Sequence, residues 1–265
     1  MGKFYLNVCL PPTAPRKLRA ALDAAMAPFD INLADEWNPD GEWDWWHIYT
    51  GEGSRFAVRP EYDGDPRLIH ESTYPSGQPR DRQPLLCDGG PRALLDFEAT
   101  KAHAVDQARA RWQAEQQDFA RLLADHPPAK PLTVFLDRHR ANPSGYPREQ
   151  AISDHHAQPL VSALNHHSAW ERYPHLGLWV LGPDSDPISH FTRDPQPDVD
   201  LAEAWALTAT ALLTLDGQWI EANRPGPFVN ARSGEDASAA YARHTTAYLE
   251  GLDGDSIIVQ LLCHC

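Results

Sequence analysis

The alternation of apolar and polar residues predicts strands at both ends of the chain. The apolar run F-Y-L-N-V-C-L at 4–10 stops at two prolines and is typical of a short strand. The run S-I-I-V-Q-L-L-C-H-C at 256–265 predicts a final strand. Between them, T-A-T-A-L-L-T-L-D-G-Q-W-I at 208–220 predicts a hairpin that turns at Asp216 and Gly217.

Apolar positions three and four residues apart predict three helices. The longest is expected over residues 91–123, where apolar side chains share one face and Arg, Gln and Glu occupy the rest. The expected ends of the helices are marked by residues that favour starts and stops: Thr13 and Pro91 at two starts, a capping box of Ser233 and Asp236 at the third, and Gly251 at the last stop.

These elements predict an α+β fold, with an antiparallel sheet and helices packed on one face. A ferredoxin-like arrangement is the specific expectation. The chain is expected to form a single domain, residues 1–265, with the proline-rich stretch 125–131 as an internal linker. The runs L-T-V-F-L at 132–136 and L-G-L-W-V-L-G at 176–182 are expected to be strands.

The charge and the apolar runs narrow the classes of partner. The net charge is -14, from 37 acidic and 23 basic residues, and the basic residues form no strong cluster. Such a chain is repelled by phosphate backbones and by anionic lipid, so we expect no nucleic-acid partner. No window has the eighteen or so apolar residues that a membrane span needs, and the start of the chain lacks the pattern of a signal peptide. We therefore expect no membrane partner and a cytoplasmic protein with reduced cysteines.

The densest aromatic cluster is W-D-W-W, from Trp43 through Asp44 and Trp45 to Trp46. On a strand, Trp43 and Trp45 point one way while Asp44 and Trp46 point the other. One face is expected to be core and the other to line a surface pocket. There the open tryptophan would contact a ligand, with Asp44 and Arg55 as polar partners. Packing alone is the alternative for these rings.

Cys87 lies in C-D-G-G-P, just before a proline that is expected to start a helix. A thiol at a helix start is favoured as thiolate by the helix dipole. His264 lies in the final strand, whose end is expected at the same rim of the sheet. Cys87 and His264 together would make a nucleophile and a base. The alternative is that the buried cysteines only fill apolar space.

A metal site is the third possibility, because histidines are concentrated in one part of the chain. They are His139, His155, His156, His166, His167, His175 and His190. None has the spacing of a known metal motif, and adjacent histidines point apart. No metal is therefore expected.

Four motifs resemble a family of uncharacterised bacterial proteins, notably of actinobacteria, and of their phages. The matching stretches are Trp43–Trp46, C-D-G-G-P with L-L-D at 87–96, D-G-Q-W at 216–219, and Cys263-His264. Two positions depart from the family pattern. I-Y-T-G-E-G-S-R-F replaces I-G-G-R-W, so that Arg55 and Phe56 are its counterparts. Leu262 stands where the family has an acid. The resemblance gives weight to these residues and implies no reaction.

Two functions follow as hypotheses. The first is an intracellular thiol-dependent enzyme acting on a small molecule or a peptide, with Cys87 and His264 as catalysts. Trp43, Asp44, Trp45, Trp46 and Arg55 would bind the substrate. The second is a phage- or mobile-element-associated module that binds a protein or a nucleotide through its aromatic face, without catalysis.

Overall fold

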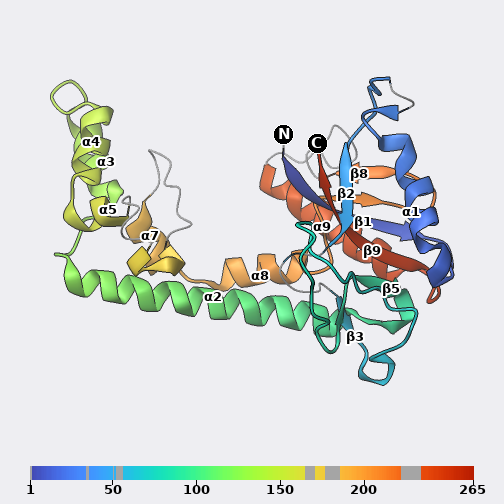
Figure 1. Cartoon of the computed structure of the whole chain (residues 1–265). Helices are drawn as coiled ribbons and strands as arrows, with labels where there is room; N and C mark the ends of the chain where they lie inside the picture. Colours follow the sequence, from blue (N-terminus) through green and yellow to red (C-terminus); the bar gives the residue numbers. More distant parts are fainter. Residues whose placement is uncertain are drawn as a thin grey trace. The chain divides into compact units, whose positions relative to one another are not determined.

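The chain divides into two compact units. The computed structural model describes residues 2–33, 36–49, 51, 56–164, 171–176, 186–221 and 234–265 (Figure 1). Unit 1 comprises Met1–Ala104 and Leu201–Cys265, and unit 2 comprises Val105–Asp200. Unit 2 is thus an insertion in the sequence of unit 1, and the single domain over residues 1–265 stays a prediction. No helix in the described ranges is both long enough and apolar enough to cross a membrane.

Unit 1 contains the strands and the helices that cover them. The strands are β1 (Lys3–Leu10), β2 (Trp45–Ile48), β3 (Phe56–Val58), β4 (Leu86–Cys87), β5 (Gly89–Pro91), β6 (Leu95–Asp96), β7 (Ala211–Leu213), β8 (Trp219–Glu221) and β9 (Ile257–His264). The helices are α1 (Leu18–Met26), α9 (Gly234–Glu250), the start of α2 (Phe97–Asp125) and the end of α8 (Gln196–Trp205).

Strand β9 is central to the main sheet, whose order is β2-β9-β1-β7-β8. It pairs antiparallel with β1 along its whole length. On its other edge, residues 261–264 pair with β2 and residues 257–259 pair with β5. A second, three-stranded sheet has the order β4-β3-β6. Segments far apart in the sequence are therefore brought together by the C-terminal strand.

The α+β class predicted from the sequence is confirmed, and two details differ. First, β1 and β7 run parallel, with Leu6 opposite Ala211, so the sheet is mixed and not the wholly antiparallel ferredoxin-like one. Second, helices cover both faces. Helix α1 packs in the apolar cluster of Leu6, whereas Leu249 of α9 packs in that of Cys9. Alternate residues of β1 point to opposite faces, so both of its faces are buried.

The C-D-G-G-P motif carries the chain from the small sheet into the main sheet. Cys87 pairs with Phe56 in the former, and Gly89 pairs with Val259 in the latter. A Cβ on Gly89 would lie 2.2 Å from the carbonyl oxygen of Ile258, and its φ of +156° is one that other residues rarely adopt. Glycine is therefore what lets β5 approach β9. Pro91 ends β5 and precedes a short 3-10 helix (Arg92–Leu94), whereas the long helix predicted to begin at Pro91 starts only at Phe97, as α2.

A buried ion pair holds the proline-rich segment against this junction. Nη1 of Arg80 lies 2.8 and 2.9 Å from the two carboxylate oxygens of Asp88, and their side chains are 5% and 1% exposed. The Asp88 carboxylate also accepts a hydrogen bond from the backbone N–H of Glu71. The Asp88 backbone N–H donates to the carbonyl of Ile69. Removing one charge would leave the other buried and unpaired, which costs about 3–5 kcal/mol.

Unit 2 is helical in its described part. It contains the rest of α2, α3 (Leu132–Ala141), α4 (Arg148–His156), α5 (Pro159–Leu164), α7 (Pro187–Thr192) and the start of α8. Its core is formed by Phe119, Leu122, Leu160, Leu164, Tyr173, Leu176 and Phe191. The strand predicted at 132–136 is wrong, because the residues belong to α3, which packs against α4. The strand predicted at 176–182 lies, from residue 177 on, outside the described residues. So does Ser233, the first residue of the predicted capping box.

The predicted linker at 125–131 connects α2 and α3 inside unit 2. The boundaries between the units fall instead within α2 and α8, where two helices run without interruption. Continuous helices carry no proline or glycine signal at such a boundary, so the pattern along the chain does not reveal it.

His155 is a buried ionisable group in unit 2. Neither of its ring nitrogens has a hydrogen-bond partner among the described residues, and Nε2 lies 3.7 Å from Asp186. Its ring packs edge-on against Phe135. Burial is the main reason why the pKa of His155 is lowered from its ordinary 6.5, with His156 adding to the effect and Asp186 opposing it. His155 is therefore neutral in the folded unit at neutral pH.

We predict that Gly89→Ala destabilises the protein by about 3 kcal/mol or more, because it combines a steric clash with an unfavourable φ. The matched control is Gly77→Ala. Gly77 has a φ of +81° and open space where the alanine methyl would lie, so this change should cost about 1 kcal/mol. Urea unfolding of both variants measures the difference. Equal losses would contradict the close approach of β5 to β9.

We also predict that unit 2 loses stability as the pH falls below about 6.5. Above this pH His155 is neutral in both states, and below it the unfolded chain takes up a proton that the folded unit excludes. The loss is at most about 1.4 kcal/mol per pH unit for one proton. Hydrogen exchange of α4 in the whole chain measures it. His155→Phe should flatten this dependence, and an unchanged slope in that variant would contradict the prediction.

Candidate ligand-binding site

Strand β2 presents its first two residues, Trp45 and Trp46, to opposite faces of the sheet, as the sequence predicts. Trp46 is buried in the cluster formed with α1, and the guanidinium of Arg19 lies 3.9 Å from the centre of its ring. Trp45 is 38% exposed and lies on the other face. Trp46 is therefore part of the core, and Trp45 is the ring that remains exposed to solvent.

The register of the sheet brings His264 beside Trp45. The two residues are directly opposite in the β2–β9 pair. Nδ1 of His264 lies 2.7 Å from a carboxylate oxygen of Asp44, and the backbone N–H of Asp44 donates to the carbonyl of His264 at 2.9 Å. Both side chains are about one-third exposed, at 31% and 33%. Three residues predicted from the sequence, Asp44, Trp45 and His264, thus form one surface.

The same surface includes His47, which was not predicted from the sequence. His47 lies two residues after Trp45 and therefore on the same face of β2. The two rings are stacked, with centroids 6.2 Å apart and planes inclined by 29°. Nδ1 of His47 lies 2.7 Å from the carbonyl oxygen of Ile48. The alternation of side chains between the two faces of a strand, which predicts that Trp45 is open, also predicts that His47 lies beside it.

Trp43 and Arg55 are also predicted from the sequence to bind a ligand. The indole N–H of Trp43 donates to the carbonyl of Met26 at 3.0 Å, and its ring packs against the core beside α1. Trp43 lies before β2 and packs in the same cluster as Trp46, so the prediction that it points the same way as Trp45 is wrong, because the strand alternation begins only at Trp45. Trp43 is therefore not part of the open surface. Arg55 lies outside the described residues.

Cys87 lies in the apolar core with Phe56 and is fully buried. Burial raises the pKa of its thiol to about 12, against a weaker lowering by the backbone of Gly89. The thiolate predicted from a helix start is therefore not formed at neutral pH, since Cys87 precedes a strand. His264 bonds to Asp44 and not to Cys87, so the structure does not bring the predicted nucleophile and base together.

The other cysteines also differ in exposure. Cys9 and Cys263 are buried, and burial raises the pKa of both thiols, that of Cys9 to about 12. Cys9 lies opposite Ile258 and Cys263 opposite Phe4, at the two ends of the β1–β9 pair, and all four cysteines are free. Cys265 is exposed.

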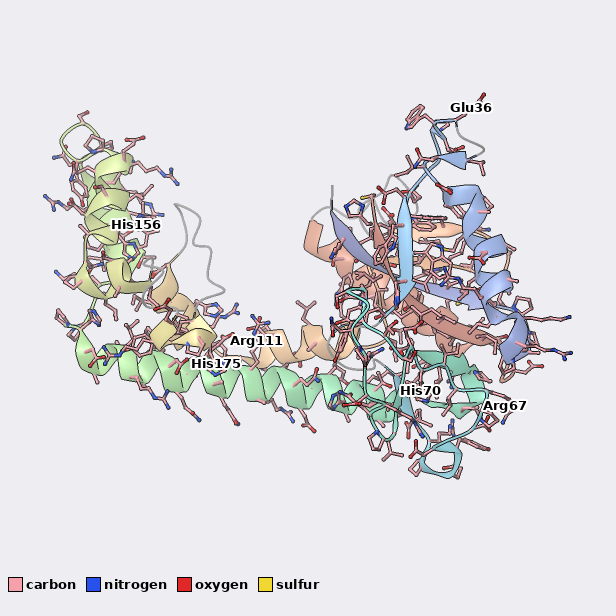
Figure 2. The ribbon with its side chains drawn as sticks, in the orientation of Figure 1. Glu36, Arg67, His70, Arg111, His156 and His175 are labelled. Carbon is pink, nitrogen blue, oxygen red and sulfur yellow. The ribbon has the colours of Figure 1, made fainter. Side chains whose placement is uncertain are left out.

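The histidines of unit 2 are spread over several elements, although His155 and His156 are adjacent in α4 with ring centroids 5.5 Å apart. Figure 2 shows His156 at the end of α4 and His175 in the short turn Pro174–Leu176. Within the described part of the chain, no group of three or more His, Cys, Asp or Glu side chains is arranged to hold a metal ion. His166 and His167 lie outside the described residues.

Comparison of the chain with protein-family models, with curated proteins and with solved structures gives no match. The resemblance of the four sequence motifs to a bacterial and phage family therefore stays a prediction.

We predict that one of the four thiols reacts rapidly with a mild aromatic disulfide near pH 7.5, and that this thiol is Cys265. The three buried thiols should react only as the protein unfolds, because they are protonated and shielded from the reagent. Absorbance of the released thiolate measures the rates. The control variant Cys265→Ser should lose the rapid phase. A rapid phase that persists in this variant and disappears in Cys87→Ser would restore Cys87 as a reactive residue.

Proposed function

We propose that the protein binds a small molecule or a peptide on the surface formed by Asp44, Trp45, His47 and His264. The ligand presents a planar apolar group to Trp45 and a hydrogen-bonding group to His264. The observation that carries this proposal is the 2.7 Å bond between Nδ1 of His264 and Asp44, directly beside the exposed ring of Trp45.

The carboxylate of Asp44 sets the chemistry of His264. An ionised carboxylate only accepts hydrogen bonds, so the Nδ1 atom that faces it must carry a proton. In the neutral imidazole the other nitrogen, Nε2, then carries the lone pair. A ligand hydroxyl or N–H can donate to this atom. The neutral form of His264 thus presents Nε2 as a hydrogen-bond acceptor.

Trp45 and His47 supply the apolar part of the site. A large exposed ring is one of the few side chains that gain substantially from covering by a planar group, through burial and through stacking. The stacked His47 ring extends the platform along the strand. Both residues lie on a strand that is hydrogen-bonded to β9, so the platform is preorganised.

Burial of Cys87 counts against the thiol-dependent reaction predicted from the sequence. A nucleophilic thiol has to contact its substrate and has to be ionised to attack it. Cys87 has no exposed surface, and its raised pKa keeps the thiol protonated at neutral pH. The surface around His264 therefore favours binding without covalent catalysis.

The test is a ligand screen by NMR with a panel of phenols, indoles, purines and short aromatic peptides. We expect that the members that bind shift the indole N–H signal of Trp45 and the ring signals of His264. Trp45→Ala and His264→Ala should each weaken their affinity about tenfold or more, which corresponds to about 1.4 kcal/mol.

The matched control is Trp37→Ala, which removes a tryptophan that is 76% exposed and not part of the site. It should leave the affinity unchanged. Asp44→Ala keeps both rings but removes the carboxylate, so it should shift the His264 ring toward the other tautomer, as ¹⁵N chemical shifts report. Binding that survives both Trp45→Ala and His264→Ala, or a panel in which nothing binds, would overturn the proposal.

A further inference from the structure

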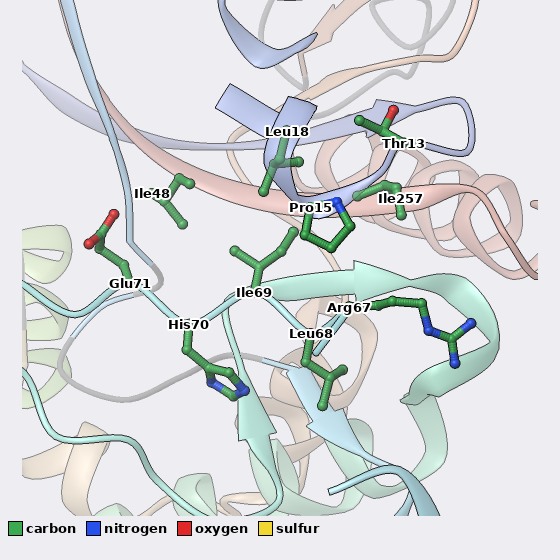
Figure 3. A pocket seen from close by; sticks show the side chains of 10 residues that line it. All are labelled: Thr13, Pro15, Leu18, Ile48, Arg67, Leu68, Ile69, His70, Glu71 and Ile257. Atoms are coloured by element: carbon green, nitrogen blue, oxygen red, sulfur yellow. The ribbon is translucent and has the colours of Figure 1, made fainter. Parts of the chain in front are cut away.

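We propose a second ligand site in unit 1, a groove that takes a small apolar amine in its ammonium form. The groove has a volume of about 240 Å³ and is formed where the start of α1 faces residues 67–71 (Figure 3). It also borders on Ile48, whose side chain lies on the opposite face of β2 from Trp45. The site therefore uses none of the residues of the proposed ligand-binding surface.

The walls of the groove are apolar. Pro15 and Leu18 form one side, and Ile69 points toward them from the other (Figure 3). Ile48 and Ile257 close the groove toward the sheet, where both belong to the buried core. An alkyl chain or a phenyl ring that enters the groove exchanges water for these side chains, which favours an apolar ligand body.

The charges at the rim are unequal. Glu71 lies near Ile48 at one end of the groove, and Arg67 lies at the other end (Figure 3). The guanidinium of Arg67 is bonded through Nε and Nη2 to both carboxylate oxygens of Asp65, at 3.0 and 2.7 Å, so its charge is compensated. The half-buried Glu71 accepts hydrogen bonds from Ser72 and Thr73 through one oxygen, and no ion pair joins it to any cation in the described ranges.

This imbalance determines the charge of the ligand. Arg67, Asp65 and Glu71 sum to one negative charge at the rim, and it is located on Glu71. The ring of His70 points away from the apolar walls in Figure 3, and burial lowers its pKa, so it adds no positive charge to the groove at neutral pH. An ammonium group beside Glu71 would supply a cationic partner that none of the described residues provides, while a carboxylate there would be repelled.

The test uses hexylamine, hexanoate and 1-hexanol, which share an apolar chain and differ in charge. Methyl signals of Ile48, Ile69 and Ile257 report on the groove in NMR titrations at constant ionic strength. We expect hexylamine to shift these signals and to bind about tenfold more tightly than hexanoate, with hexanol between them. Hexanoate that binds as tightly as hexylamine would overturn the proposal, and so would groove methyl signals that do not shift.

Two variants separate a specific site from the general attraction of an acidic protein for cations. Glu71→Gln should weaken hexylamine about fivefold or more while leaving hexanol unchanged, and Glu71→Lys should reverse the preference in favour of hexanoate. The matched control is Glu61→Gln, which removes an exposed carboxylate that does not line the groove. If Glu71→Gln and Glu61→Gln weaken hexylamine equally, or if Glu71→Lys keeps the preference for the amine, the groove does not select a cation.

Discussion

The pairing of β9 on both of its edges is the constraint on which the rest of unit 1 depends. Its backbone bonds to β1 along one edge and to β2 and β5 along the other. Nearly every side chain of β9 is buried, so a shift of one residue in its register would turn an apolar row toward the wrong cluster. The positions of His264 beside Trp45 and of Gly89 against Ile258 both follow from this one register.

The part of the fold that local pattern determines was predictable from the sequence. The first strand, the final strand and the hairpin around Asp216 and Gly217 are all formed, since period-two alternation and turn residues are properties of short segments. The turn of the hairpin spans Leu215 to Gly217, between the hydrogen-bonded Thr214 and Gln218, so it is one residue longer than predicted. The direction of β7 relative to β1 was not predictable. It depends on a crossover through a long stretch of chain, for which no local residue gives a signal.

L-T-V-F-L at 132–136 shows that a short apolar run alone does not distinguish a strand from a helix. A short apolar run is compatible with a buried strand and with a turn of helix, and only its neighbours decide. Here D-R-H-R follows and continues as helix, while Leu132 is buried in unit 2. The predicted helix start at Pro91 is wrong for a different reason. The local signal for a helix start is present, but Gly89, Gly90 and Pro91 pair with β9 as an extended strand.

Of the candidate site, the sequence predicted Asp44, Trp45 and His264 but not the contact between Asp44 and His264. These residues are 220 positions apart, and only the pairing of β2 with β9 makes them neighbours. The sequence predicts a reactive Cys87 because the residue is expected at the start of a helix. Cys87 lies in strand β4, so the helix dipole does not favour its thiolate. The groove residues 67–71 come from a proline-rich stretch without periodicity, so nothing in the local pattern marks them as a binding surface.

The insertion of unit 2 within unit 1 has a consequence for the order in which the protein is made. On the ribosome, β1 and β2 are synthesised first, but β9 is added only after all of unit 2 has been translated. Unit 2 is a continuous stretch of chain and can fold while β9 does not yet exist. Until then the apolar β1 lacks its longest partner. A nascent chain that stalls before residue 257 therefore exposes an unpaired strand edge, which is a substrate for chaperones and a risk for aggregation.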